Sequence, residues 1–228
     1  TAAKLGYVSA GHHRVSMTVV SFIARKPGEG VQHSQSLQAL FAHIPGLKVI
    51  MPATAYDAKG MLISAIRDDD PVIVLYHRSL FEKESEVPEN LYVEDFSTQV
   101  RVKSDTSVVT IVTISATFTE GLLALNILRE QNVFVDLIDL RSIRPLDISP
   151  ILESIKKTGR LLVVDTGWKS FGVSAEILAS VVEGAHYYLK STPRRIGMVE
   201  MPCPATPYLL NNYHPTTEQI VETVQSML

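Results

Sequence analysis

The chain has 228 residues, of which 46% are hydrophobic and 20% are charged, and its formal net charge is −3. This composition predicts a folded chain of one large or two small domains, and it gives no reason to expect a nucleic acid or an anionic membrane as partner. A single cysteine, Cys203, excludes a disulfide within the chain, and no apolar run reaches the roughly 18 residues that a membrane helix needs.

The first 80 residues alternate between strand-like and helix-like segments. The segment 1–7 is typical of the end of a helix, so we expect the parent protein to have a further N-terminal part. Thr54 precedes a helical pattern and Asp57 follows three residues later, as at a helix N-terminus. The predicted elements are a strand at 15–23, a loop at 25–30, a short loop at 30–36, a helix at 36–43, a strand at 47–51, a helix at 54–67 and a strand at 72–76.

A change of character at residues 78–100 divides the chain. This stretch is polar and irregular, which favours a linker, so we expect one domain at 1–80, a linker at 81–100 and a second domain at 101–228. Strands that alternate with helices in the second domain predict a parallel α/β sheet. Its predicted strands are 108–114, 133–140, 161–165 and 196–199, and its predicted helices are 117–130, 148–157, 175–183 and 216–227.

Few residues carry a chemical signal by themselves. His33 lies at a predicted loop-to-helix junction, where an imidazole can face a cavity, but a lone histidine beside serine and glutamine is more often a surface or capping residue. The acidic run 68–70 is suited either to a divalent ion or to a solvated helix end. The sequence contains no glycine-rich nucleotide loop and no nucleophile elbow.

Several motifs together point to a family. They are His33-Ser34-Gln35-Ser36 and the segments 41–49, 52–60, 65–71, 139–147 and 157–161. Their order along the chain resembles that of the β subunit of thiamine diphosphate-dependent 2-oxoacid dehydrogenases of the pyruvate, branched-chain and acetoin type. The resemblance covers residues 1–228 and implies two parallel or mixed sheets with flanking helices, in a partial pyrimidine-binding domain and a transketolase C-terminal-type domain.

The resemblance implies a catalytic role for His33. The matching histidine of the family lines the active-site funnel and assists with the substrate carboxylate or with proton transfer during acyl transfer to lipoamide. The family glutamate that activates thiamine diphosphate precedes residue 1, and the motif that holds Mg²⁺ and the diphosphate belongs to the α subunit. We therefore assign no cofactor-binding residue here and expect this chain alone to be inactive in decarboxylation.

The same resemblance implies a structural monovalent cation, usually K⁺, in the first domain. The corresponding positions are Met17, Thr18, Ala65, Asp68 and Asp70. Oxygen ligands suit a hard cation. The family often has asparagine at the position of Asp70, so the match is imperfect.

The implied function is that of a β subunit in a heterotetramer with an α subunit. The expected complex decarboxylates a 2-oxoacid oxidatively and transfers the acyl group to lipoamide on an acyltransferase core, with β–β self-association. Two alternatives stay open: a non-catalytic assembly fragment that binds the α subunit and the core, and a transketolase-like sugar-phosphate enzyme. The expected location is the cytoplasm if the source is bacterial and the mitochondrial matrix if it is eukaryotic.

Overall fold

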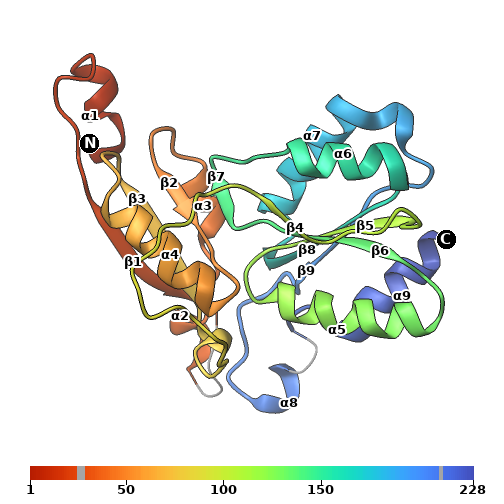
Figure 1. The fold of residues 1–228 in the computed structure, drawn as a ribbon. Helices are drawn as coiled ribbons and strands as arrows, with labels where there is room; N and C mark the ends of the chain where they lie inside the picture. The colour runs from red at the N-terminus through yellow and green to blue at the C-terminus, as the bar shows by residue number, and fades with distance from the viewer. Residues whose placement is uncertain (25–28, 211–212) are drawn as a thin grey trace.

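The computed structural model describes residues 1–24, 29–210 and 213–228, and it contains two sheets that lie beside each other (Figure 1). The first sheet has four strands in the order β1-β3-β2-β7. β1, β3 and β2 are parallel, whereas β7 pairs with β2 in the antiparallel direction. The bounds are β1 Thr18–Ile23, β2 Lys48–Ile50, β3 Val72–His77 and β7 Ser142–Arg144.

The second sheet has five strands in the order β4-β6-β5-β8-β9. All its neighbours are parallel except β4, which runs antiparallel to β6. The residues of β5 and β6 are buried throughout, as expected of central strands with both faces covered. The bounds are β4 Gln99–Val102, β5 Val109–Thr113, β6 Val135–Asp139, β8 Leu161–Trp168 and β9 Arg194–Met198.

Helices cover both faces of the second sheet. Figure 1 shows α6 and α7 on one face and α5 and α9 on the other. The bounds of the described helices are α1 Ala2–Val8, α2 Gly30–His33, α3 Gln38–Ala42, α4 Ala55–Ile66, α5 Thr117–Glu130, α6 Ser149–Thr158, α7 Val173–Ala185, α8 Pro207–Leu210 and α9 Thr217–Met227, with 3₁₀ turns at Arg78–Leu80 and His186–Tyr188. None of these helices is long and apolar enough to cross a membrane.

Local signals explain where two of the helices begin. The hydroxyl of Thr54 accepts a hydrogen bond from the backbone N–H of Asp57 and so caps α4. Thr216 and Gln219 form a full capping box at the start of α9. Both helix starts agree with the sequence predictions.

One hydrophobic cluster crosses from the first sheet to the second. It contains Val49 and Leu75 from the first sheet and Val112 and Ile138 from the second, all fully buried. The two sheets therefore share a core, and burying this apolar surface stabilises their contact.

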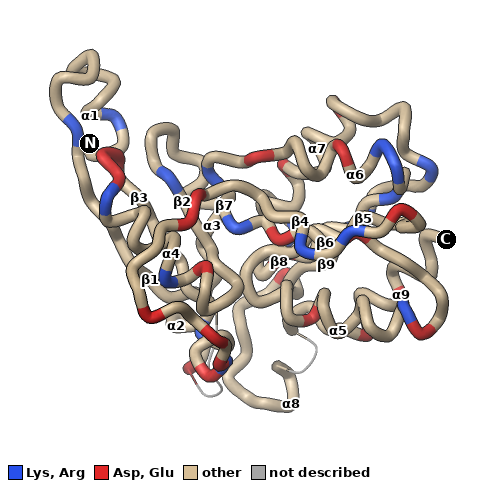
Figure 2. The backbone as a smooth tube through the Cα atoms, viewed as in Figure 1, with Lys and Arg blue, Asp and Glu red and all other residues tan. Residues whose placement is uncertain are grey.

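Acidic and basic residues are interspersed along the backbone tube in Figure 2.

Most of the predicted strands and helices are confirmed, whereas the short elements β4, β7 and α8 had no sequence prediction. The loop prediction for 30–36 is wrong in its first part, because residues 30–33 form the single turn α2. β7 lies at residues 142–144, within the predicted second domain, and nevertheless joins the first sheet through β2. In the predicted loop 25–30, residues 25–28 lie outside the described residues.

Candidate functional site

His33 ends α2, and its side chain is exposed. The next residues alternate, with Ser34 and Ser36 buried and Gln35 exposed. The backbone oxygen of Gln35 accepts a hydrogen bond of 3.0 Å from the N–H of Ala24, just after β1. The segment is thus tied to the end of a strand while it presents an imidazole at the surface.

A cavity of about 480 Å³ adjoins this segment. Its walls come from α2 and the following turn on one side, and from the end of β8 and the chain after β9 on the other. His33 itself is not among the lining residues. The cavity is lined by Val31, Gln32, Ser34, Gln35, Trp168, Glu200, Met201, Pro202 and Cys203.

The lining of this cavity does not fit a diphosphate group. Among the described residues, its lining contains no lysine, arginine or histidine, and the one charged side chain is the carboxylate of Glu200. A diphosphate needs cationic or metal partners, so these residues do not hold thiamine diphosphate by themselves. Among the described residues, no group of three or more His, Cys, Asp or Glu side chains is arranged to hold a metal ion.

A second, larger hollow of about 1440 Å³ lies between α1, α3 and the start of α7. Ser36 and Leu37 contribute to its wall, and Trp168 lines both this hollow and the smaller cavity. Residues 29–37, called the His33 segment below, therefore contribute to the walls of two concave surfaces.

The predicted cation residues do come together, beside the start of β1. The hydroxyl of Thr18 donates to the backbone oxygen of Ala65 at 2.9 Å, and the backbone oxygen of Met17 accepts from Val72 N–H at 2.9 Å. The Lys48 ammonium lies 2.7 Å from the carboxylate of Asp68. Their oxygen atoms suit a hard monovalent cation, but a lysine already neutralises part of the acidic charge.

Asp70 also has cationic neighbours. Its carboxylate lies 3.4 Å from the ammonium of Lys48 and 3.1 Å from the guanidinium of Arg14. The acidic run is therefore an ion-paired helix end, which explains how it tolerates its place after α4.

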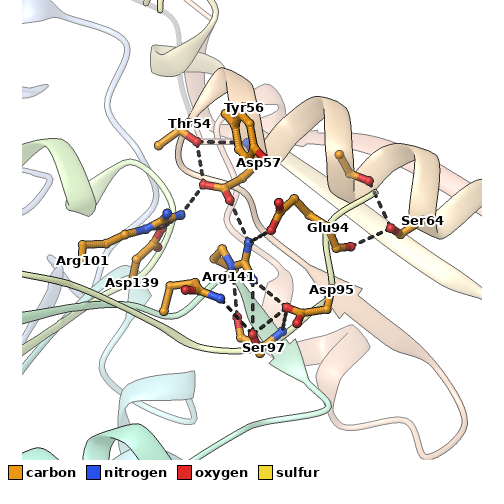
Figure 3. Close-up of polar contacts among 12 residues, drawn as sticks. Thr54, Tyr56, Asp57, Ser64, Glu94, Asp95, Ser97, Arg101, Asp139 and Arg141 are labelled. Atoms are coloured by element: carbon orange, nitrogen blue, oxygen red, sulfur yellow. Dashed lines mark hydrogen bonds and ion pairs between the residues drawn. The ribbon is translucent and has the colours of Figure 1, made fainter. Parts of the chain in front are cut away.

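A buried arginine organises a polar network between the two sheets (Figure 3). Arg141 follows β6 and is only 1% exposed. Its Nη1 donates to Asp57 Oδ1 at 2.8 Å and to Glu94 Oε2 at 3.0 Å. Its Nη2 donates to Asp95 Oδ1 at 2.8 Å, and its Nε donates to the backbone oxygen of Ser97 at 3.0 Å. One guanidinium thereby joins α4, the segment 94–97 and the chain after β6.

A second arginine extends the network. Arg101 on β4 contacts Asp57 and lies 3.1 Å from Asp139 Oδ2 on β6 (Figure 3). Burial raises the pKa of Asp139 to about 7, although the charge of Arg101 opposes this effect. Oδ1 of Asp139 has no hydrogen-bond partner in the described part of the chain. The sequence analysis missed this network, because Asp57 and Arg141 are 84 positions apart and meet only in the fold.

Two family descriptions match this chain. Residues 2–83 match "Transketolase, pyrimidine binding domain", and residues 98–220 match "Transketolase, C-terminal domain". The β subunit of an acetoin:2,6-dichlorophenolindophenol oxidoreductase from Cupriavidus necator is 36% identical over 100% of this chain and 67% of its own length. The chain belongs to the family of 2-oxoacid dehydrogenase β subunits. This confirms the resemblance and the two-sheet fold predicted from sequence.

Two further comparisons add a second relative and a solved structure with the same fold. The mitochondrial pyruvate dehydrogenase E1 component subunit beta-1 of Arabidopsis thaliana is 38% identical over 97% of this chain and 62% of its own length. A solved split-gene transketolase, described as an inactive β4 tetramer, has the same fold, with a TM-score of 0.75 at 22% identity over 92% of this chain and 66% of its own. The chain thus spans about two thirds of the length of these relatives.

Proposed function

We propose that this chain is the larger part of a β subunit that acts with an α subunit in thiamine diphosphate-dependent oxidative decarboxylation of a 2-oxoacid. The observation that carries the proposal is the match to β subunits of an acetoin oxidoreductase and a pyruvate dehydrogenase over 97–100% of this chain, together with an exposed imidazole in the His-Ser-Gln-Ser segment beside a cavity.

The role of this chain is to supply His33 rather than to hold the cofactor. Thiamine diphosphate, when bound, supplies the decarboxylation chemistry, and the α subunit would hold its diphosphate with Mg²⁺. The described lining of the cavity, which includes no cationic side chain, supports this division. Histidine exchanges a proton near neutral pH, so His33 would assist the substrate carboxylate and the transfer of the acyl group to lipoamide.

The proposed assembly contains α subunits, a second β subunit and a lipoyl acyltransferase core. The mitochondrial plant relative and the bacterial relative make the mitochondrial matrix and the bacterial cytoplasm the two proposed locations. A monovalent cation at Met17, Thr18, Ala65, Asp68 and Asp70 stays a proposal, which is supported by the cluster of oxygen atoms from these residues.

The test is the variant His33→Ala in the full-length β subunit, co-expressed with its α subunit. We expect the rate of 2-oxoacid-dependent acylation of a lipoyl domain to fall by about 100-fold or more, the usual contribution of a proton-transfer group. His12→Ala, an exposed histidine outside the described helices and strands, is the matched control and should keep the rate.

The result has two readings. A wild-type heterotetramer without 2-oxoacid activity would refute the enzyme proposal and favour an assembly role. Full activity of His33→Ala would refute the catalytic role of His33 but not the enzyme proposal.

A further inference from the structure

The His33 segment has one anchor in the second sheet that the sequence analysis did not identify. This anchor is Gln38, the first residue of α3, which is 2% exposed. Its Nε2 donates to Oδ1 of Asp165 on β8 at 3.2 Å, and Thr166 Oγ1 lies at 3.5 Å from the same nitrogen. The contact therefore joins the end of the His33 segment to a strand of the other sheet.

Asp165 is held rigidly by its own surroundings. Its carboxylate is fully buried and accepts hydrogen bonds from the backbone N–H of Gly167 at 2.9 Å and of Ser174 at 3.3 Å. One donor from β8 and one from the start of α7 thus hold the two carboxylate oxygens. Gln38 thus donates to an acceptor whose position is already set, and this geometry limits where α3 can lie.

The chain makes room for this contact at Gly167. A Cβ atom at this position would lie 2.6 Å from Nε2 of Gln38, which is closer than a real side-chain contact permits. Gly167 has no positive φ that would otherwise call for glycine. The missing side chain is therefore explained by the close approach of the Gln38 amide.

Loss of this amide would be costly at a buried site. Burial raises the pKa of Asp165, while the amides of Gly167 and Ser174, the side chain of Gln38 and the charge of Arg195 act in the opposite direction. Without Gln38 the carboxylate keeps its two backbone donors but loses its link to the first sheet. The segment between Ala24 and α3 would then be held less firmly.

We propose that Gln38 and Asp165 are a positioning pair that holds the His33 segment, residues 29–37, in the position that the catalytic role of His33 requires. This inference rests on the proposed role of His33. Neither residue needs to touch substrate, because the effect passes through the backbone from α3 to the end of α2. A displacement of about 1 Å at a catalytic group can reduce a rate by up to about 100-fold.

The first test measures the segment without any cofactor or substrate. We expect Gln38→Ala to speed hydrogen–deuterium exchange in residues 29–37 by about tenfold or more, while α4 exchanges as in the wild type. Gln38→Glu should show a pH signature, since the protonated carboxyl can donate to Asp165 and the ionised one repels it. After correction for intrinsic exchange rates, the amides of residues 29–37 in this variant should be protected from exchange at pH 5 and unprotected at pH 8.

The matched control is Gln131→Glu, the same change at an exposed glutamine that hydrogen-bonds Gln225. It should leave exchange in residues 29–37 unchanged at both pH values. Unchanged exchange in Gln38→Ala, or the absence of a pH effect in Gln38→Glu, would overturn the proposal that Gln38 and Asp165 position this segment.

The second test uses the full-length β subunit assembled with its α subunit. Gln38→Ala should lower kcat about tenfold and leave KM within about twofold, as expected when a reactive group is displaced but binding is retained. Faster exchange with an unchanged kcat would overturn the positioning role and leave a purely structural contact. Because exchange needs no catalysis, a failure of the enzyme proposal appears separately, as an inactive wild type.

Discussion

At the scale of a single residue, Asp139 shows how burial controls a charge. Its folded pKa of about 7 exceeds the roughly 3.9 of an exposed aspartate, so between these values the folded state keeps a proton that the unfolded state releases. The stabilisation from this group is therefore fully present below about pH 4 and is lost as the pH rises through 7. Asp139→Asn removes this titration.

The expected outcome for Asp139→Asn is a stability difference that depends on pH. Relative to wild type, the free energy of unfolding of the variant should rise by about 2 kcal/mol between pH 5 and pH 8. Urea unfolding at the two pH values measures it. Asp105→Asn, a change at an exposed carboxylate, is the control. A difference for Asp139→Asn that stays constant across the pH range would contradict the raised pKa.

At the scale of an element, α4 carries a glycine that is explained by its neighbours. A Cβ at Gly60 would lie 2.6 Å from Cγ of Glu94 and 2.8 Å from Cε2 of Tyr92. The higher helix propensity of alanine would favour Gly60→Ala by up to about 1 kcal/mol. The added methyl group would, however, displace the segment that carries Glu94 from its present position beside Arg141. We expect a net destabilisation of about 1–2 kcal/mol by chemical denaturation.

Gly6→Ala in α1 is the matched comparison for Gly60→Ala. Its nearest neighbour would be the backbone oxygen of His13 at 3.8 Å, an ordinary contact. This variant should therefore be neutral or slightly stabilising, since alanine favours a helix over glycine. If both variants had the same effect on the unfolding midpoint, crowding by Glu94 and Tyr92 would not explain Gly60.

The limits of sequence reasoning are also clear at this scale. α4 was predictable because Thr54, Asp57 and a 3.6-residue apolar repeat are local signals. β7 was not, since it has three residues and its partner β2 lies more than 90 positions away in the chain. The site divides in the same way: a local motif indicated His33, whereas the Gln38–Asp165 and Asp57–Arg141 contacts exist only after folding.

At the scale of the whole molecule, Arg141 connects the two sheets and the segment between them. Arg141→Met keeps most of the side-chain volume but leaves Asp57 buried without its second arginine and Glu94 without this partner. Breaking a buried ion pair from one side typically costs about 3–5 kcal/mol. We expect a loss of this order in the free energy of unfolding, measured by chemical denaturation, and faster proteolysis within residues 81–98.

The double variant Asp57→Asn/Arg141→Met separates a charge effect from simple loss of packing. It removes the carboxylate that the single variant leaves with Arg101 as its remaining arginine partner, so it should recover about 1 kcal/mol or more relative to Arg141→Met. The backbone N–H of residue 57 still donates to Thr54, and the side-chain oxygen of asparagine can accept from the Thr54 hydroxyl as Oδ2 of Asp57 does. If the double variant were as unstable as the sum of both single variants, the two residues would act independently. The connection between the sheets would then rest on their shared apolar core, which both variants leave intact.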